Sequence, residues 1–335
     1  MSRKITIVGD GSMATVCALL LDSRGEQVTI WGAFPDQIAD MIQTRENRQF
    51  MPGCRIPESI RLTADQGKAF ADAQFILSAV PTQHMRSVWD RLAPHVPAST
   101  PIASVAKGIE NETLLRPTQI ITDVLGDSDR SLAAISGPSV ADELARCLPA
   151  TVCAASDDAE FAGLLQQTFT CHWFRVYTHD DILGVELAGA TKNVIALAAG
   201  ILDGLQAGNN AKSALLARGL AEITRLGVAM GAKDTTFFGI AGVGDLATTC
   251  FSPTGRNRTC GERLGKGQKL EDVLDGMSNV VEGVPTTRSV VALAAKHQVE
   301  MPITQAVYHV LFEQLDPIEA ISQLMSRQLK AERIG

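Results

Sequence analysis

One lysine lies within an otherwise apolar helical pattern, which is an unusual place for a charge. The pattern runs near Asp181 to Leu205. The stripe that contains Lys192, at a spacing of three and four, is otherwise small and apolar: Val185, Ala188, Gly189, Ala196 and Ala199. A lysine there would be partly desolvated, which lowers its pKa and suits it to acid–base catalysis. The alternative is a lysine that extends to solvent or pairs with nearby Glu186.

Three further charged residues stand where a ligand could bind. Lys107 comes just after a predicted strand, although it could equally be a solvated loop lysine. Asp245 follows three closely spaced glycines and could orient a lysine or a substrate hydroxyl, or simply cap a helix. Arg256 lies in a turn, Ser252 to Arg258, that opens a helix. Arginine and amide donors at a helix start would bind a phosphate well, the alternative being a basic surface turn.

The first strand and the turn after it indicate a second kind of site. Lys4 to Val8 is typical of a buried parallel strand, and an apolar helix continues from Thr15. Between them Gly9 to Ala14 fits G-x-G-x-x-G/A. The first glycine permits the tight turn, the second lets a pyrophosphate approach, and alanine still allows helix–strand packing. With the positive end of the helix dipole, this context predicts dinucleotide binding, the alternative being a glycine turn without a ligand.

Strand-like runs alternate with helical patterns up to residue 135. The next strands are expected at Gln27–Trp31, Ala73–Val80, Pro101–Val105 and Leu132–Ile135, with further candidates at Thr151–Ala155 and Trp173–Tyr177. Residues 36–70 look helical and then irregular. The alternation predicts a parallel, doubly wound sheet, in which ligands bind beyond the carboxyl ends of the strands.

Two of these strand ends bear on the ligand. The second strand ends at Gly32 to Pro35 without the acidic residue that often binds an adenosine ribose, and the first carboxylate is Asp36. Ser139 follows the fifth strand and forms, with Asp142, a pattern like a capping box. This predicts a helix that begins at Ser139 at the same edge of the sheet. A plain N-cap is the alternative to a substrate contact for this serine.

The pattern changes after about residue 180, where strand-like runs give way to long helical patterns. We therefore predict two domains, residues 1–180 and 181–335, in keeping with the chain length. A net charge of −7 argues against nucleic acid as the main partner. No run approaches the roughly 18 consecutive apolar residues of a membrane span, so none is expected.

The cysteines and the N-terminus indicate the compartment. The seven cysteines are scattered and include no C-x-x-C pair, which predicts reduced thiols in a cytoplasmic protein. The chain enters a strand directly, so no signal peptide is expected. Cys171 and His172 could be half of a metal site, but no second pair has ligand spacing, and we expect no metal.

Taken together, the motifs resemble those of the bacterial type of NAD(P)-dependent glycerol-3-phosphate dehydrogenase, from Ile5 to about Met325. They are Gly9–Ala14, Ala106–Gly108, Ile135–Ser139, Gly184–Leu187, Thr191–Asn193, Ala241–Leu246, Arg256–Arg258 and Val281–Gly283. The resemblance implies a Rossmann-like, doubly wound α/β domain followed by an all-helical substrate domain. It also implies interconversion of dihydroxyacetone phosphate and sn-glycerol 3-phosphate with NADPH and/or NADH, feeding glycerophospholipid synthesis.

The resemblance also assigns roles to residues of this chain. It implies that Lys192 is the proton donor and acceptor at the substrate C2 oxygen, that Lys107 contacts cofactor and substrate, and that Asp245 lies beside the reacting end. The implied substrate-binding residues are Lys107, Gly137, Ser139, Lys192, Asp245, Gly255, Arg256 and Asn257. The implied cofactor-binding residues are Gly9, Gly11, Ser12, Met13, Ala14, Ala33, Lys107, Ala141, Arg256, Val280 and Glu282.

Two positions depart from the family pattern. Family members often carry a basic residue where Ala33 stands and a serine where Gly255 stands. The first departure leaves the cofactor choice open, and we predict that NADPH is accepted alongside NADH. A non-catalytic dinucleotide sensor and a two-domain dehydrogenase of a 3-hydroxy acid are the alternative functions. The oligomeric state is also open, with a homodimer as the candidate assembly.

Overall fold

The chain divides into two compact units, each with its own hydrophobic core. The structure is a computed structural model that describes residues 2–126, 129–277, 279–329 and 331–332. One unit comprises Met1–Ala106 and Pro117–Ile182, and the other comprises Lys107–Arg116 and Leu183–Gly335. The segment Lys107–Arg116 thus groups with the helical unit, although it lies far upstream of residue 180 in the chain.

The first unit is built on an eight-stranded sheet with the order β5-β2-β1-β6-β7-β8-β9-β10. All neighbouring strands are parallel except β8 and β9, which are antiparallel. The chain starts near the middle and winds to both sides, which confirms the predicted doubly wound α/β sheet. The strands are β1 (Lys4–Val8), β2 (Gln27–Trp31), β5 (Arg61–Thr63), β6 (Phe75–Ser78), β7 (Ile102–Ser104), β8 (Leu132–Ser136), β9 (Ala150–Ala155) and β10 (Phe174–His179).

The stretch predicted as irregular contains strands that the sequence did not reveal. β5 pairs with β2 at one edge of the sheet, and β3 (Glu46–Asn47) and β4 (Met51–Arg55) form a separate hairpin. β3 and β5 are short and contain no apolar run like those of the predicted strands, and Pro52 and Gly53 interrupt β4. The pattern therefore could not distinguish them from loop.

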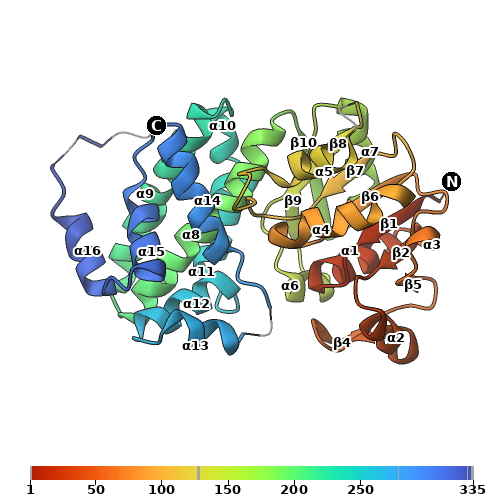
Figure 1. Cartoon of the computed structure of the whole chain (residues 1–335), viewed down its shortest axis with the longest axis horizontal. Coiled ribbons are helices and arrows are strands. Elements are labelled where there is room, and N and C mark those ends of the chain that lie inside the picture. The colour runs from red at the N-terminus through yellow and green to blue at the C-terminus, as the bar shows by residue number, and fades with distance from the viewer. Residues whose placement is uncertain (1, 127–128, 278, 330, 333–335) are drawn as a thin grey trace. The chain divides into compact units, whose positions relative to one another are not determined.

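Helices cover the sheet and fill the connections between its strands, as Figure 1 shows for the elements from α1 to α7. The core between them contains strand residues such as Ile7, Leu77 and Ile135 together with Leu21 of α1. The helices are α1 (Ser12–Ser23), α2 (Pro35–Thr44), α3 (Gln66–Ala69), α4 (Thr82–Leu92), α5 (Pro117–Leu125), α6 (Ala141–Ala145) and α7 (Ala159–Phe169), with a 3₁₀ turn at Ala93–His95.

The second unit is helical in its described residues, which confirms the predicted all-helical part. Its longest helix is α8 (Ile182–Gly204), within two residues of the predicted limits. A π-helical turn at Ile240–Gly244 precedes α11. The other helices are α9 (Gly208–Ala229), α10 (Asp234–Phe237), α11 (Asp245–Phe251), α12 (Arg256–Gly265), α13 (Leu270–Asp275), α14 (Gly283–Lys296), α15 (Pro302–Phe312) and α16 (Pro317–Met325).

Helix α8 is the central helix of this unit. By length and composition it could cross a membrane, but 83% of its most apolar window is buried inside the protein. Core residues such as Val194, Leu197 and Ile201 pack against the other helices of the same unit. This burial is what a core helix shows.

Glycines bring α8 and α12 into backbone contact. A Cβ added at Gly200 would lie 2.0 Å from the carbonyl oxygen of Arg258, and one added at Gly261 would lie 2.0 Å from that of Leu197. Gly204 and Gly265 repeat the contact one turn further along. No side chain fits between the two helices, so the start of α12 is held close to the middle of α8.

Candidate active site

Two lysines of the second unit share one buried aspartate. Lys192 Nζ lies 2.6 Å from Asp245 Oδ1, and Lys107 Nζ lies 2.6 Å from Asp245 Oδ2. The side chains of Lys192 and Asp245 are only 7% and 3% exposed. A buried ion pair adds little net stability compared with apolar residues of similar size, so the presence of these pairs indicates a role in function and not in stability. The structure brings together the three residues for which catalytic roles are implied.

Burial controls the protonation of this cluster. Burial is the largest influence and lowers the pKa of Lys192, Asp245 raises it and Lys107 lowers it, and together they bring it to about 8. Burial by itself would raise the pKa of Asp245, but the two lysines outweigh it and hold that pKa below its usual value. Near neutral pH, Lys192 is therefore an ammonium that can release its proton easily, beside an ionised carboxylate.

Three of the alternatives from the sequence are wrong. Glu186 does not pair with Lys192, because its carboxylate accepts a hydrogen bond from Arg116. Asp245 is not an N-cap: Gly244 holds that position, and the Asp245 carboxylate is directed to the lysines. Lys107 is likewise no solvated loop lysine, since its side chain is 17% exposed and paired.

Neighbouring residues that the sequence analysis did not single out hold the cluster in place. Thr249 Oγ1 accepts a hydrogen bond from Lys192 Nζ at 2.6 Å and donates one to the Asp245 carbonyl at 2.7 Å. Asn193 Nδ2 donates to the Lys107 carbonyl at 2.9 Å. Thr249 is four residues after Asp245 on one helix face, a spacing that could have revealed it. Asn193 gave no such signal, because its partner is 86 residues away.

The start of α12 is tied to the same region. Asn257 Nδ2 donates to Asn193 Oδ1 at 2.9 Å, and its Oδ1 accepts from the backbone N–H of Gly283 at 2.9 Å. Its amide thus joins α8, α12 and α14. Gly255 is the N-cap of α12, and among the described residues no side chain caps this helix. Its first N–H groups, which have no partner within the helix, can therefore bind a ligand.

Three residues implied in cofactor binding also meet at this place. Arg256 Nη1 donates to the Val280 carbonyl at 3.2 Å, and the Glu282 charge acts on the same guanidinium. Arg256 is the first residue of α12, and Glu282 is the N-cap of α14. Arginine at this position can present further N–H groups to an anion.

The glycine turn of the first unit has the shape that a dinucleotide needs. Gly9 has a φ of +121°, and a Cβ there would lie 2.8 Å from the Ala79 carbonyl oxygen, so only glycine fits. A Cβ at Gly11 would meet nothing within 4 Å, which leaves open space beside the N-cap of α1. No side chain among the described residues caps that helix, so its N–H groups remain for phosphates. Ala14 is fully buried and Ser12 and Met13 form the first turn.

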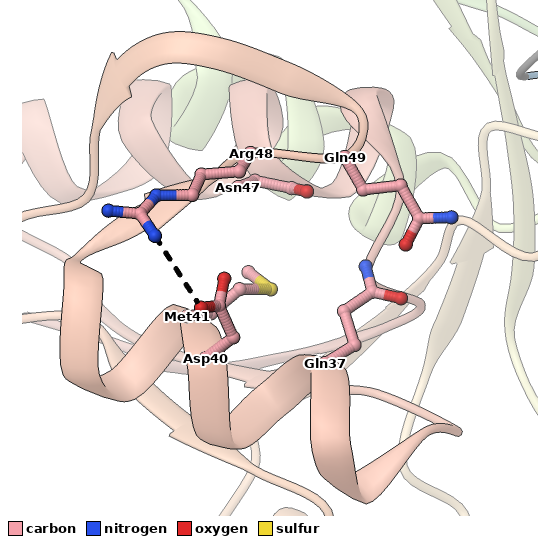
Figure 2. Close-up of a pocket in the computed structure, with 6 residues that line it drawn as sticks. All are labelled: Gln37, Asp40, Met41, Asn47, Arg48 and Gln49. Atoms are coloured by element: carbon pink, nitrogen blue, oxygen red, sulfur yellow. Dashed lines mark ion pairs between the residues drawn. The ribbon is translucent and has the colours of Figure 1, made fainter.

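A pocket of about 450 Å³ lies between α2 and the β3–β4 hairpin, and one of its lining residues, Asn47, holds the glycine turn in place. Asn47 in its wall donates to the Asp10 carbonyl at 2.8 Å and to Thr15 Oγ1 at 2.9 Å. Figure 2 shows Arg48 and Asp40 facing each other across the pocket, with Gln37 and Gln49 at the other end. No residue predicted for the site lines this pocket, but two of its lining residues, Asn47 and Gln37, bind the Asp10 carbonyl of the turn.

The loop after β8 differs from the expectation at Ser139. Its helix, α6, begins at Ala141 with Val140 as N-cap, so the predicted capping box is wrong. The Ser139 hydroxyl donates instead to the Gly137 carbonyl at 2.9 Å, closing a tight turn. Gly137 has a φ of +142°, which favours glycine there. Gly137, Ser139 and Ala141 thus lie at the carboxyl end of β8, beyond which such sheets bind ligands.

A dinucleotide-type α/β unit joined to a helical unit with a buried, easily deprotonated lysine defines a nicotinamide-dependent dehydrogenase. Family models agree: the N-terminal part of NAD-dependent glycerol-3-phosphate dehydrogenase matches residues 4–162, and its C-terminal part matches residues 181–322. The chain belongs to the NAD(P)-dependent glycerol-3-phosphate dehydrogenase family.

Individual relatives support this membership over the full chain. The glycerol-3-phosphate dehydrogenase of Pelotomaculum thermopropionicum is 46% identical over 98% of this chain and 94% of its own length. That of Geobacter sp. strain M21 is 45% identical over 100% of both. The crystal structure of the Coxiella burnetii enzyme, 37% identical, covers 97% of this chain and 99% of its own with a TM-score of 0.93. The activity is that of an NAD(P)-dependent oxidoreductase acting on glycerol 3-phosphate.

Proposed function

We propose that this chain interconverts dihydroxyacetone phosphate and sn-glycerol 3-phosphate with Lys192 as the acid–base group. The observation that carries the proposal is the buried contact of Lys192 with Asp245, which also binds Lys107. We further propose that it works in the cytoplasm and supplies the glycerol phosphate backbone of phospholipids. The free state of all seven cysteines, all within the described ranges, is compatible with a reducing compartment.

Lys192 is suited to serve the C2 oxygen of the ketone. The bound nicotinamide supplies the hydride for the reduction. As negative charge grows on the ketone oxygen, the Lys192 ammonium stabilises it and donates a proton to it, leaving a neutral amine and an alcohol. In the reverse direction the neutral amine accepts the proton. The pKa of about 8 allows both states near neutral pH.

The geometry leaves one N–H of Lys192 for this task. An ammonium has three N–H donors. Among the described residues, Asp245 Oδ1 and Thr249 Oγ1 are the acceptors bound to Nζ. Two contacts fix the direction of the side chain, and the third donor is available to a substrate oxygen.

The other roles that the family resemblance implies divide between the two units. In the first unit, Gly9, Gly11, Ser12, Met13, Ala14, Ala33 and Ala141 hold the cofactor, and Gly137 and Ser139 contact substrate. In the second unit, Lys107 and Asp245 contact substrate, Gly255, Arg256 and Asn257 bind its phosphate, and Lys107, Arg256, Val280 and Glu282 contact the cofactor. Residues 1–180, apart from the segment Lys107–Arg116, then form the NAD(P)-binding domain, and residues 181–335 with that segment form the substrate and catalytic domain. The phosphate is remote from the reacting carbon and supplies binding energy that orients the ketone.

The test is NADPH and NADH oxidation with dihydroxyacetone phosphate, first with the unchanged protein and then with Lys192→Ala. General acid–base catalysis contributes about 10²–10⁴-fold, so kcat of the variant should fall by at least that range. Cofactor affinity, followed by nicotinamide fluorescence, should change little. A variant that keeps a third of the original kcat would remove Lys192 from the role proposed for it.

A further inference from the structure

An arginine from a distant part of the sequence lies where β2 ends. Ala33 and Phe34 follow β2 and carry neither a basic nor an acidic side chain. Arg91, near the end of α4, directs Nη2 to the Ala33 carbonyl at 3.5 Å. Its Cζ lies 4.7 Å from the ring centroid of Trp31, the last residue of β2. All of these residues belong to the first unit.

The Arg91 guanidinium is available to an anion. The residue is exposed, and within the described ranges no carboxylate pairs with it. The long contact to Ala33 and the stacking on Trp31 involve one N–H and one face of the group, so further N–H donors remain for a ligand. Stacking on a fully buried ring also limits the side chain to few orientations. Little entropy is then lost when it binds a ligand.

The surroundings of Arg91 provide the rest of an adenosine site. Phe34 is 65% exposed, although it is a large aromatic residue. Asp10 is an acid that lies close to this strand end, since a Cβ added at Gly32 would lie 2.5 Å from its Oδ2. Asp10 is only 9% exposed, so it does not offer its oxygens outward to a ribose. The outer face thus combines an aromatic ring and a cation.

We propose that Arg91 binds the 2′-phosphate of NADPH and makes this chain accept the phosphorylated cofactor. In doubly wound folds, the adenosine ribose lies at the end of the second strand, where an acid selects NAD and an arginine accommodates the 2′-phosphate of NADP. The planar guanidinium can bind two phosphate oxygens at once. The positive charge that Ala33 cannot supply is thus supplied from α4. The inference rests on the family's use of NAD(P), and not on the roles proposed for Lys192 or Arg256.

The test is direct binding of cofactors without substrate, by calorimetry or nicotinamide fluorescence. Arg91→Gln should weaken NADPH ten- to hundredfold, because charge-assisted hydrogen bonds are lost, and change NADH by less than about threefold. Among fragments, 2′,5′-ADP should lose the same factor and 5′-AMP almost none. Arg91→Lys keeps the charge without the planar fork and should give an intermediate loss.

Arg86→Gln is the matched control, since it removes a charge from the same helix. Arg86 is already bound to Asp123 at 2.6 Å, so this variant should bind both cofactors as the unchanged protein does. Equal losses of NADPH and NADH in Arg91→Gln would show that Arg91 only supports the fold or the adenine. Unchanged binding of both would exclude it from the site. Neither result would alter the assignment of Lys192, which the binding experiment does not involve.

Discussion

Asp245 sets the electrostatics of the site because it is shared by two lysines. Its negative charge raises the pKa of Lys192, while the positive charge of Lys107 lowers it. Burial is the largest influence and leaves the pKa of Lys192 at about 8. The reactivity of one residue therefore depends on two others that come from distant parts of the chain.

The first prediction is a pH profile with two shifted variants. Ketone reduction needs the ammonium, so kcat/KM for dihydroxyacetone phosphate should fall as pH rises through about 8. Lys107→Gln removes the positive neighbour and should move this limb to higher pH. Asp245→Asn removes the negative neighbour and should move it to lower pH. The measurement is the initial rate between about pH 6 and pH 10, the range over which a lysine with this pKa titrates.

Both variants will also lose activity, so the position of the limb is the informative quantity. Lys296→Gln is the control, because Lys296 is an exposed residue at the end of α14. It should leave the profile in place. Shifts of Lys107→Gln and Asp245→Asn in the same direction would contradict the assignment of the limb to Lys192.

The second prediction concerns Arg256 as a phosphate ligand. Arg256→Ala should reduce kcat/KM for dihydroxyacetone phosphate roughly ten- to hundredfold, because charge-assisted hydrogen bonds are worth about 1.5–3 kcal/mol each. Unphosphorylated dihydroxyacetone has no such contact to lose, and its low rate should fall much less. Equal proportional losses for the two substrates would assign Arg256 to the cofactor or to the fold.

At the scale of elements, the packing of α8 against α12 positions the site. Glycines at Gly200 and Gly261 let the helix backbones touch, and Asn193 of α8 then reaches Asn257 of α12. This contact brings the residues proposed for the phosphate to the helix that carries the lysine.

The third prediction tests that contact with single methyl groups. Gly200→Ala would place a Cβ 2.0 Å from the Arg258 carbonyl oxygen, so the helices must separate. Forcing extra atoms into such packing costs about 1–3 kcal/mol, and the melting temperature should fall by several degrees together with kcat/KM. Gly163→Ala in α7 is the control, because its Cβ would meet nothing within 4 Å. It should leave activity unchanged and raise stability slightly, since alanine favours a helix. Similar effects of the two changes would show that the close approach has no consequence.

At the scale of the whole molecule, the two kinds of site belong to different units. The glycine turn lies in the sheet unit, and the lysine–aspartate cluster lies in the helical unit. Lys107 belongs to the helical unit, because the segment Lys107–Arg116 groups with that unit although it lies between two strands of the sheet in the sequence. A change that loosens the turn should therefore affect cofactor binding and spare the acid–base chemistry.

The fourth prediction uses the buried amide behind the turn. Asn47→Ala removes two hydrogen bonds that hold Asp10 and Thr15, and should weaken NADPH and NADH alike, by roughly three- to tenfold. At saturating cofactor, kcat should stay within about twofold. Gln49→Ala, in the same pocket, is the control and should bind as the unchanged protein does. A loss of kcat with cofactor affinity intact would argue against separate roles for the units.

Much of the fold could be predicted because its signals are local. The strand runs, the glycine turn and the long helix around Lys192 depend on residues near one another in the chain, and all were found within a few residues. The edge strand β5 and the β3–β4 hairpin were missed because they contain no apolar run and because Pro52 and Gly53 interrupt β4. The helix after Ser139 begins two residues later than predicted, because the serine hydroxyl bonds to the Gly137 carbonyl instead of capping.

The fold class, the family and the residue types that can do the chemistry could be predicted from the sequence, because the order of the motifs and the hydrophobic period are local properties of the chain. The partners of these residues became known from the three-dimensional structure. Lys192 pairs with Asp245 and not Glu186, Asn193 joins Lys107 to Asn257, and Arg91 reaches the end of β2. Each of these contacts joins residues more than fifty positions apart. Their pairing depends on how helices and strands pack, and no local pattern specifies that.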